Sequence, residues 1–255
     1  MAWGAVEGAV DAPLENLTVA AISEHPFGAI TFTGDRWALS DVRLVAPILP
    51  SKVVAIGKNY SDHVKEMGSL TGPADEQRTT PVMFLKPSTS VIGTNDVIRL
   101  PPTSSRVDYE AELAVVIGRP AKDVTREDAL NHVFGYTCAN DVTARDQQQA
   151  DGQWSRAKGY DSFCPIGPWI ETVLDPSDLA IKTRVNGELR QDGRTSAMIH
   201  DVATIVAFAS SVMTLLPGDV LLTGTPAGVG PIVAGDRVDI EIEGIGVLTN
   251  LVKTK

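Results

Sequence analysis

Short apolar or alternating stretches recur along this chain between Gly, Pro and Asn-Gly, and this pattern constrains the fold more than any other feature. Such stretches are typical of β-strands. RVNGELR favours a hairpin, because Asn186-Gly187 suits a two-residue turn with positive φ at both positions. The predicted strands are Leu17–Ile22, Ala29–Phe32, Val53–Ile56, Val82–Leu85, Val97–Leu100, Ala111–Ile117, Val133–Asn140, Trp169–Thr172, Ile181–Val185, Val220–Thr223, Val238–Ile242 and Val247–Leu251.

Two segments predict longer helices. VTREDALNHV, residues 124–133, has Thr125 three residues before Asp128, which is the spacing of a capping box. The second helix begins after Asp201 as N-cap and stops before Pro217-Gly218. Many strands and few helices predict a mixed, mostly β fold of the α+β class. The proline-rich residues 46–52 predict a join between a small N-terminal β domain, residues 1–50, and a main domain, residues 51–255.

Composition excludes several classes of protein. The net charge of −10, without a Lys/Arg cluster, argues against nucleic-acid binding. No apolar run approaches the roughly 20 residues of a membrane span. The first residues lack the basic and apolar regions of a signal peptide. Two cysteines, Cys138 and Cys164, make a disulfide framework improbable, so we expect a cytoplasmic protein.

Two glutamates stand in the stretch DYEAELAVVIG, which is nearly all small, branched or apolar from Ala111 to Ile117. Glu110 and Glu112 are two residues apart, so a strand points both carboxylates to the same face. Asp141 ends another alternating stretch and supplies a third acid. Three carboxylates predict an oxygen-only site suited to Mg²⁺, Mn²⁺ or Ca²⁺. The alternative is an exposed face on which the glutamates pair with Arg106 or Lys122.

The stretch GKNYSDHVKEMG favours a short helix that Gly68 ends. His63 and Glu66 are three residues apart and share one face of that helix. A carboxylate beside an imidazole fixes its tautomer, which suits deprotonation of water, although such a pair is usually a solvated surface contact. Residues 69–81 are polar and contain glycine, as a mobile lid would.

Three cations and one loop complete the candidate residues. Lys86, Arg145 and Lys158 can balance the acids, or they can be ordinary surface charges. The glycine-rich residues 221–231 follow an apolar strand and match neither the G-x-G-x-x-G nor the P-loop pattern. They form either a tight turn or a loop in which Thr225 and backbone N–H groups hold a carboxylate.

Taken together, the motifs resemble the fumarylacetoacetate hydrolase family, specifically its short acylpyruvate hydrolase and oxaloacetate decarboxylase branch. The resemblance covers about residues 51–252 and rests on an ordered set of motifs: AIGKNYSDHVKEM, FLKPST, DYEAELAVVIG, NDVTARDQQ, AKGYDSFCPIGPWI, VNGELRQDG, SAMIHDV and LLPGDVLLTGTPAGVGP. It implies a β-roll or barrel-like catalytic domain with few helices, and a homodimer.

The resemblance also implies roles for individual residues. The metal, Mg²⁺ or Mn²⁺, is expected on Glu110, Glu112 and Asp141. The implied catalytic residues are the water-activating pair His63 and Glu66 together with the active-site lysine, Lys158. The implied substrate contacts are Lys86, Arg145, Gln148 and Thr225. Lys58 stands where these relatives usually have arginine, and a lysine lacks the fork that clamps a carboxylate.

The expected activity is divalent-metal-dependent cleavage of a C–C bond in a short 2-oxo acid through a metal-bound enolate. Its substrate would be a 2-oxo dicarboxylic acid or an acylpyruvate, and its reaction oxaloacetate decarboxylation, acylpyruvate hydrolysis or both. The nearest alternative is an enzyme of aromatic catabolism, a 2-hydroxyhepta-2,4-diene-1,7-dioate isomerase or 5-oxopent-3-ene-1,2,5-tricarboxylate decarboxylase. A non-catalytic 2-oxo-acid-binding protein is a further alternative, against which His63, Glu66 and Lys158 argue.

Overall fold

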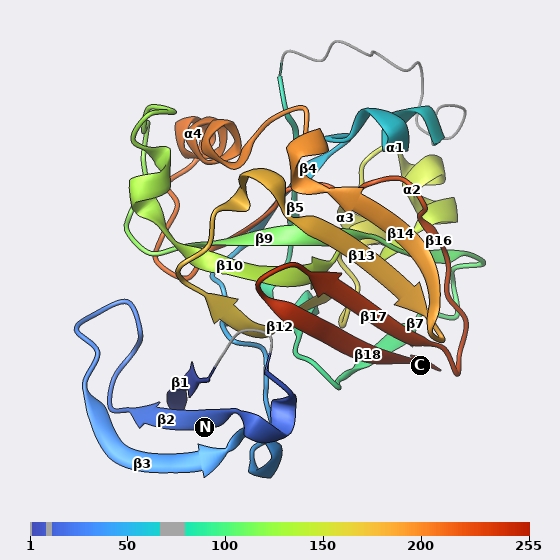
Figure 1. The fold of residues 1–255 in the computed structure, drawn as a ribbon. Helices are drawn as coiled ribbons and strands as arrows, with labels where there is room; N and C mark the ends of the chain where they lie inside the picture. The colour runs from blue at the N-terminus through green and yellow to red at the C-terminus, as the bar shows by residue number, and fades with distance from the viewer. Residues whose placement is uncertain (1, 9–11, 67–79) are drawn as a thin grey trace. The chain divides into compact units, whose positions relative to one another are not determined.

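The computed structural model describes residues 2–8, 12–66 and 80–255, and the chain divides into two units, Met1–Leu44 and Val45–Lys255. The predicted end of a helix at Gly68 and most of the predicted lid, residues 69–79, lie outside the described residues. The first unit is a three-stranded antiparallel sheet of β1 (Trp3–Glu7), β2 (Thr18–Ile22) and β3 (Phe32–Ala38) (Figure 1). The strand predicted at Ala29–Phe32 is therefore misplaced. β3 is almost wholly exposed, so it carries no apolar pattern that would reveal it.

The second unit contains a curled seven-stranded sheet with the order β5-β4-β15-β9-β10-β12-β6. Its strands are β4 (Val53–Gly57), β5 (Val82–Lys86), β6 (Val91–Ile92), β9 (Ala111–Ile117), β10 (Val133–Asn140), β12 (Cys164–Glu171) and β15 (Val220–Leu222). Every residue of β9 is buried, because this strand is central in the sheet and both of its faces are covered.

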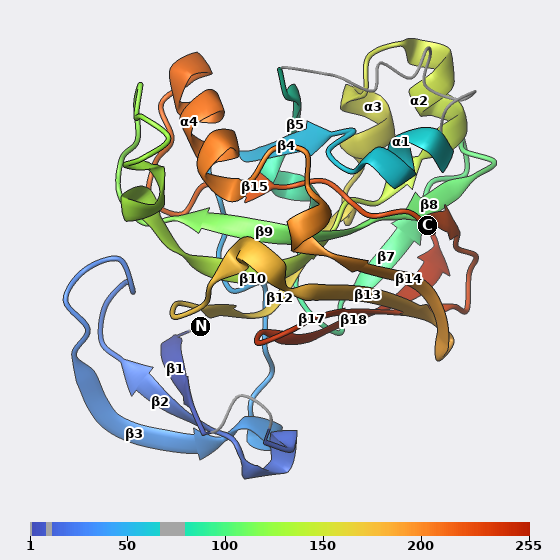
Figure 2. The ribbon, with the colours of Figure 1, turned by 45° about the horizontal axis from the view of Figure 1, so that its top comes forward.

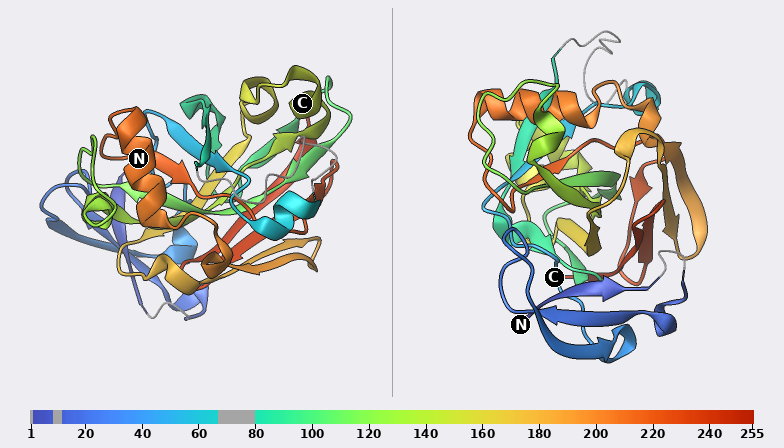
Figure 3. Two further views of the ribbon diagram at one scale, coloured as in Figure 1. Left: turned by 90° about the horizontal axis from the view of Figure 1, so that it is seen from above. Right: turned by 60° about the vertical axis from the view of Figure 1, so that its left-hand side comes forward.

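A five-stranded sheet with the order β14-β13-β17-β18-β7 packs against the first sheet (Figures 2 and 3). Its strands are β7 (Val97–Leu100), β13 (Ala180–Val185), β14 (Glu188–Arg194), β17 (Arg237–Ile242) and β18 (Gly246–Thr254). Asn186 and Gly187 have φ values of 54° and 84°, which confirms the predicted hairpin turn between β13 and β14. A small third sheet joins β8 (Val107–Tyr109), β11 (Thr143–Ala144) and β16 (Gly230–Pro231).

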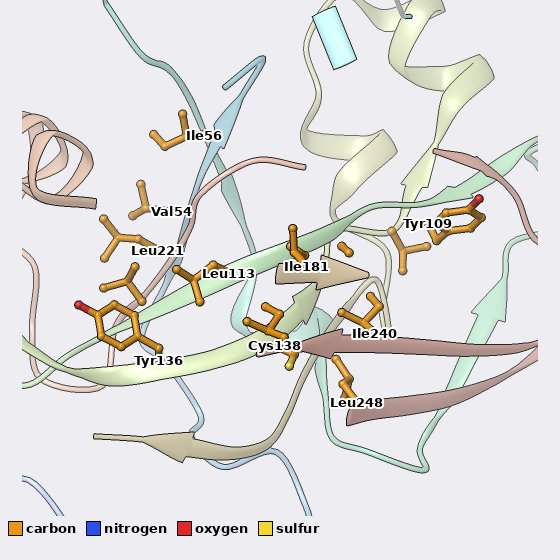
Figure 4. Packing of buried hydrophobic residues seen from close by; sticks show 14 of the residues in the cluster. Val54, Ile56, Tyr109, Leu113, Tyr136, Cys138, Ile181, Leu221, Ile240 and Leu248 are labelled. Carbon is orange, nitrogen blue, oxygen red and sulfur yellow. The ribbon is translucent and has the colours of Figure 1, made fainter. Parts of the chain in front are cut away.

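The hydrophobic core lies between the two larger sheets. Leu113 and Cys138 from the first sheet face side chains of the second sheet, among them Ile181, Ile240 and Leu248 (Figure 4). All five are at most 1% exposed. Both cysteines are buried free thiols. This packing of sheet on sheet confirms the predicted mostly β class.

The described α-helices are α1 (Ser61–Glu66), α2 (Arg145–Asp151), α3 (Ser155–Lys158) and α4 (Val202–Val212). Asp201 accepts a hydrogen bond from the Thr204 N–H at 2.8 Å, which confirms the predicted N-cap of α4. The helix predicted over residues 124–133 is wrong. Thr125 accepts from the Asp128 N–H at 3.3 Å, but only a 3₁₀ turn, Ala129–His132, follows before the chain enters β10.

Short helices gather at one end of the first sheet. α1, α2 and α3 lie together there, and α4 lies apart from them over the other end (Figures 1 and 2). The remaining 3₁₀ turns are Leu14–Asn16, Leu39–Asp41, Ser88–Ser90, Pro176–Asp178 and Thr195–Ala197. None of the helices in the described ranges has the length and hydrophobicity needed to cross a membrane.

Candidate metal centre and active site

The three predicted metal ligands meet where β8 gives way to β9. Glu110 lies between these strands, Glu112 is the second residue of β9, and Asp141 directly follows β10. β9 and β10 pair antiparallel, and the Asp141 N–H donates to the Glu110 carbonyl at 2.9 Å. One oxygen from each carboxylate lies within 4.8 Å of the others. The three residues are 1–4% exposed, so the alternative of an exposed glutamate face does not hold.

Two buried lysines neutralise part of this acidic cluster. Lys158 Nζ donates to Glu110 Oε2 at 2.8 Å and to Asp141 Oδ2 at 2.5 Å. Lys86 Nζ donates to Asp141 Oδ1 at 2.6 Å and to the Lys158 carbonyl at 2.5 Å. Lys86 is 1% exposed and lies behind Asp141, whereas Lys158 faces the pocket. Lys86 thus supports the site from the protein side.

Arg145 supplies the third buried cation from the first residue of α2. Its Nη2 donates to Glu110 Oε1 at 2.5 Å and its Nε to Asp108 Oδ2 at 2.9 Å. Its Nη1 donates to Gln148 Oε1 at 2.7 Å. Asp108 also forms an ion pair with Arg106, one of the two residues that the alternative interpretation paired with the glutamates. The guanidinium is therefore held in place on three sides before any substrate binds.

Glu112 differs from the other two acids, because it has no ion pair within the described part of the chain. Its Oε2 accepts one hydrogen bond from the Gly224 N–H, at 2.6 Å. Burial, Asp141 and Glu110 together raise the pKa of Glu112 well above its ordinary value. Burial also acts to raise the pKa of Glu110, but Lys158 and Arg145 outweigh it and hold that pKa below the ordinary range. An oxygen-only set with one uncompensated carboxylate fits a divalent cation.

His63 and Glu66 lie on α1 beside the cluster, with His63 Nδ1 3.6 Å from Glu66 Oε2. Glu66 accepts from the Gly228 N–H at 3.0 and 3.2 Å. Contact with His63 and the Gly228 N–H lower the pKa of Glu66 against the opposing effect of burial. The Nδ1 of His63 is buried without a hydrogen bond inside the described residues. The predicted pairing of these two side chains is thus present in space.

One pocket brings most of the predicted residues together. The predicted residues that line it are Glu110, Glu112, Asp141, His63, Lys158, Arg145, Gln148, Thr225 and Lys58. Lys86 and Glu66 are not in its lining. Lys58 has a φ of 60°, an uncommon conformation for a residue other than glycine.

Trp154 also lines the pocket and was not among the predicted site residues. Its indole lies against Gly57, where an added Cβ would come 2.5 Å from Trp154 Cζ3. The indole also packs edge-on against Phe84, with ring centroids 5.2 Å apart. A tryptophan in the polar stretch DGQWSRAKG was the available signal, because an aromatic ring there needs an apolar surface to contact.

The fold and the pocket define a mostly β protein with a buried acidic site of the kind that binds a divalent metal ion. Residues 52–253 match the family described as fumarylacetoacetate (FAA) hydrolase C-terminal, and the chain belongs to this family. Residues 1–47 match a family described as Rv2993c-like, N-terminal.

Individual relatives cover most of the chain. It is 58% identical to Protein Rv2993c of Mycobacterium tuberculosis, over 100% of this chain and 95% of that protein. It is 43% identical to oxaloacetate tautomerase YisK of Bacillus subtilis, over 84% of this chain and 74% of that protein.

Solved structures also resemble the chain. A 2-hydroxyhepta-2,4-diene-1,7-dioate isomerase from Mycobacterium marinum is 56% identical with a TM-score of 0.90, over 99% of this chain and 93% of that chain. A maleylpyruvate hydrolase from Sphingobium sp. SYK-6, in complex with manganese(II) and pyruvate, is 39% identical with a TM-score of 0.74, over 86% and 77% of the two chains.

Proposed function

We propose that the chain is a divalent-metal-dependent enzyme that enolises a short 2-oxo acid, with oxaloacetate as the first substrate to test. The observation that carries the proposal is the uncompensated Glu112 in a buried triad, beside Lys158 and Arg145 in one pocket. A divalent cation and an anionic substrate together complete the charge balance of such a pocket. Oxaloacetate tautomerase YisK, a relative by sequence, supports this choice of substrate.

Glu110, Glu112 and Asp141 would hold the metal ion, Mg²⁺ or Mn²⁺. When bound, such an ion acts as a Lewis acid toward the keto oxygen of a 2-oxo acid and so favours loss of the proton on the neighbouring carbon. The maleylpyruvate hydrolase solved with manganese(II) and pyruvate supports both the metal and the class of ligand.

The side chains of the chain itself supply binding and proton transfer. Lys158, fixed between Glu110 and Asp141, places a positive charge where enolate charge develops. Arg145, Gln148, Thr225 and Lys58 line the pocket and are the proposed contacts for the carboxylate groups of the substrate.

His63 is the proposed proton carrier. A proton on Nδ1 directs the ring toward Glu66, 3.6 Å away, and leaves Nε2 as the base on the pocket side. A tautomerase needs a base that moves a proton between carbon and oxygen, and this pair is suited to that step.

The second candidate is C–C bond cleavage, as acylpyruvate hydrolysis or oxaloacetate decarboxylation. In both of these reactions the breaking C–C bond leaves its electron pair on pyruvate as an enolate, so the same residues would stabilise the developing charge. The His63–Glu66 pair favours hydrolysis, because a base oriented by a carboxylate can also activate the water that attacks the distal carbonyl. Isomerisation of a heptadienedioate is the reaction in the name of the Mycobacterium marinum structure. Like tautomerisation, and unlike C–C cleavage, it requires only proton transfer.

A substrate panel tests the proposal. Oxaloacetate, acetylpyruvate, fumarylpyruvate and 2-hydroxyhepta-2,4-diene-1,7-dioate are each incubated with Mg²⁺, with Mn²⁺ and with EDTA. Decay of the oxaloacetate enol absorbance without formation of pyruvate identifies tautomerisation, whereas pyruvate measured with lactate dehydrogenase identifies cleavage. No metal-dependent turnover of any member would refute the proposal. Size-exclusion chromatography with light scattering tests the homodimer, which stays a prediction.

A further inference from the structure

Gln191 is a buried residue of β14 that links the second sheet to the candidate site. It is 0% exposed, and its side-chain amide makes four hydrogen bonds. Its Oε1 accepts from the Ala111 N–H at 3.0 Å and from the Thr183 hydroxyl at 2.8 Å. Its Nε2 donates to Thr225 Oγ1 and to the Pro226 carbonyl, both at 2.8 Å.

These partners allow only one orientation of the Gln191 amide. The Ala111 N–H can only donate, so the atom facing it must be the amide oxygen. The Pro226 carbonyl can only accept, so the atom facing it must be the amide nitrogen. A flipped amide would oppose donor to donor and acceptor to acceptor.

The fixed amide decides what the Thr225 hydroxyl can do. Because Gln191 Nε2 donates to it, Thr225 Oγ1 acts as an acceptor in that bond. It makes no other hydrogen bond to the residues that the structure describes, so its own hydrogen is available to a ligand. Thr225 is 3% exposed and lines the pocket, so the ligand group it faces is a hydrogen-bond acceptor.

The loop that carries Thr225 is held firmly at both ends. Gly224 donates its N–H to Glu112, and Gly228 donates its N–H to Glu66. Gly228 has a φ of 97°, and a Cβ there would come 2.2 Å from the Arg190 carbonyl, so the loop packs directly on β14. The residue after Arg190 is Gln191, and its partner Ala111 lies between Glu110 and Glu112. Gln191 therefore fixes the loop relative to the acids.

We propose that Gln191 is a positioning residue, which makes the Thr225 hydroxyl donate into the pocket and thereby sets the binding of a carboxylate oxygen of the substrate. The inference rests on the proposed function, because a 2-oxo acid supplies that carboxylate. Gln191 acts through Thr225 and does not itself line the pocket.

The test uses pyruvate as the probe and isothermal titration of the full chain in excess Mn²⁺. Gln191→Met keeps the length of the side chain and removes its polar atoms. It should weaken pyruvate binding about tenfold, the loss expected for one hydrogen bond to a charged group. With a substrate that turns over, KM should rise by a similar factor and kcat should change much less.

A double-mutant cycle separates positioning from general damage. If Gln191 acts through the Thr225 hydroxyl, Gln191→Met should have little further effect on the pyruvate Kd of a Thr225→Val protein. Thr183→Val is the matched control, because it removes one buried hydrogen bond to Gln191 Oε1 and leaves the Nε2 side intact. It should lower the Tm and leave the pyruvate Kd within about twofold, since the bond to Thr225 remains.

The outcomes separate this inference from the proposed function. A wild-type protein that binds no pyruvate and turns over no 2-oxo acid overturns both. A second outcome is that the wild type binds pyruvate normally while the effects of Gln191→Met and Thr225→Val on the Kd multiply in the double mutant. Gln191 then does not act through Thr225, and only its positioning role is overturned. If Gln191→Met does not fold, Thr225→Ser and Thr225→Val decide: Thr225→Ser should bind pyruvate almost normally and Thr225→Val about tenfold more weakly. Equal binding by these two variants overturns the inference.

Discussion

Replacing Glu112 with glutamine should stabilise the metal-free protein at neutral pH and abolish its stabilisation by Mn²⁺. Glu112 is the triad acid without an ion pair in the described ranges, and its pKa is raised by burial, Asp141 and Glu110. Glutamine has nearly the same shape and can still accept from the Gly224 N–H, but it brings no charge into the buried site. Losing that charge also removes one of the proposed metal ligands.

The expected pH dependence follows from the sign of the shift. Because the folded-state pKa lies above the ordinary value of 4.5, the folded chain keeps the Glu112 proton at pH values where the unfolded chain has lost it. The free energy of unfolding of the metal-free wild type should therefore fall as the pH rises above 4.5 toward the raised pKa, by at most about 1.4 kcal/mol per pH unit. The free energy of unfolding of Glu112→Gln should not show this fall with pH, because glutamine has no proton to lose in this range.

The metal effect can be estimated in the same way. Mn²⁺ at one hundred times its Kd adds about 2.7 kcal/mol to the stability of the folded state. For a unit of this size that corresponds to a rise in Tm of about 5 to 11 °C. The wild type should show this rise, and Glu112→Gln should show almost none.

Thermal melts between pH 5 and 8, in EDTA and in Mn²⁺, make the measurement. Asp108→Asn is the matched control, because it is an equally buried acid-to-amide change at a carboxylate that is ion-paired with Arg145 and Arg106. Breaking its buried ion pair with Arg145 should destabilise that variant by about 3–5 kcal/mol with or without metal. A metal-free Glu112→Gln protein that melts below the wild type at pH 7, or that gains as much from Mn²⁺, would refute the reasoning.

Further changes test other parts of the site. His63→Ala should reduce acetylpyruvate hydrolysis by about 10²- to 10⁴-fold and oxaloacetate decarboxylation by far less, because decarboxylation needs no attacking water; equal losses of kcat would contradict this division. Tyr60→Phe should raise the free energy of unfolding in urea by about 1 kcal/mol, since the Tyr60 hydroxyl is buried without a hydrogen-bond partner in the described part of the chain; an unchanged midpoint would count against it. Gly57→Ala forces the Trp154 indole, 2.5 Å from the new Cβ, to move and should raise KM, as should Trp154→Leu; an unaltered KM in both would show that this wall does not contact substrate.

The alternation of residues along a strand was enough to predict that two acids share a face, but it could not show whether that face is buried. Alternation along a strand places Glu110 and Glu112 on one face, whichever strands lie beside it. Whether that face is buried depends on β9 being central in its sheet, which follows from strand order. Only the antiparallel pairing with β10 brings Asp141 next to Glu110. Local sequence contains neither fact, so it cannot distinguish a buried pair of glutamates from an exposed one.

Residues that support the site without lining the pocket were the hardest to predict. Lys86 is a lysine at the end of an apolar strand, and nothing local distinguishes contact with substrate from its place behind Asp141. Gln191 stands in a polar hairpin strand whose other residues are mostly exposed, so its burial depends on the loop that packs over it. The helices α2 and α3 are too short and polar to give an apolar periodicity. At residues 124–133 the local signal was present but misleading. The capping contact of Thr125 forms, yet no α-helix follows it, because the chain enters β10 at Val133.

The order of the ligands along the chain limits when a metal ion can act during folding. Glu110 and Asp141 meet only through the β9–β10 ladder, and Glu112 is held by a loop more than one hundred residues further along. An unfolded chain therefore offers no assembled binding site, and the ion cannot guide the first pairing of strands. A bound ion would therefore act on kinetic stability: it should slow unfolding of the native state and leave the folding rate unchanged.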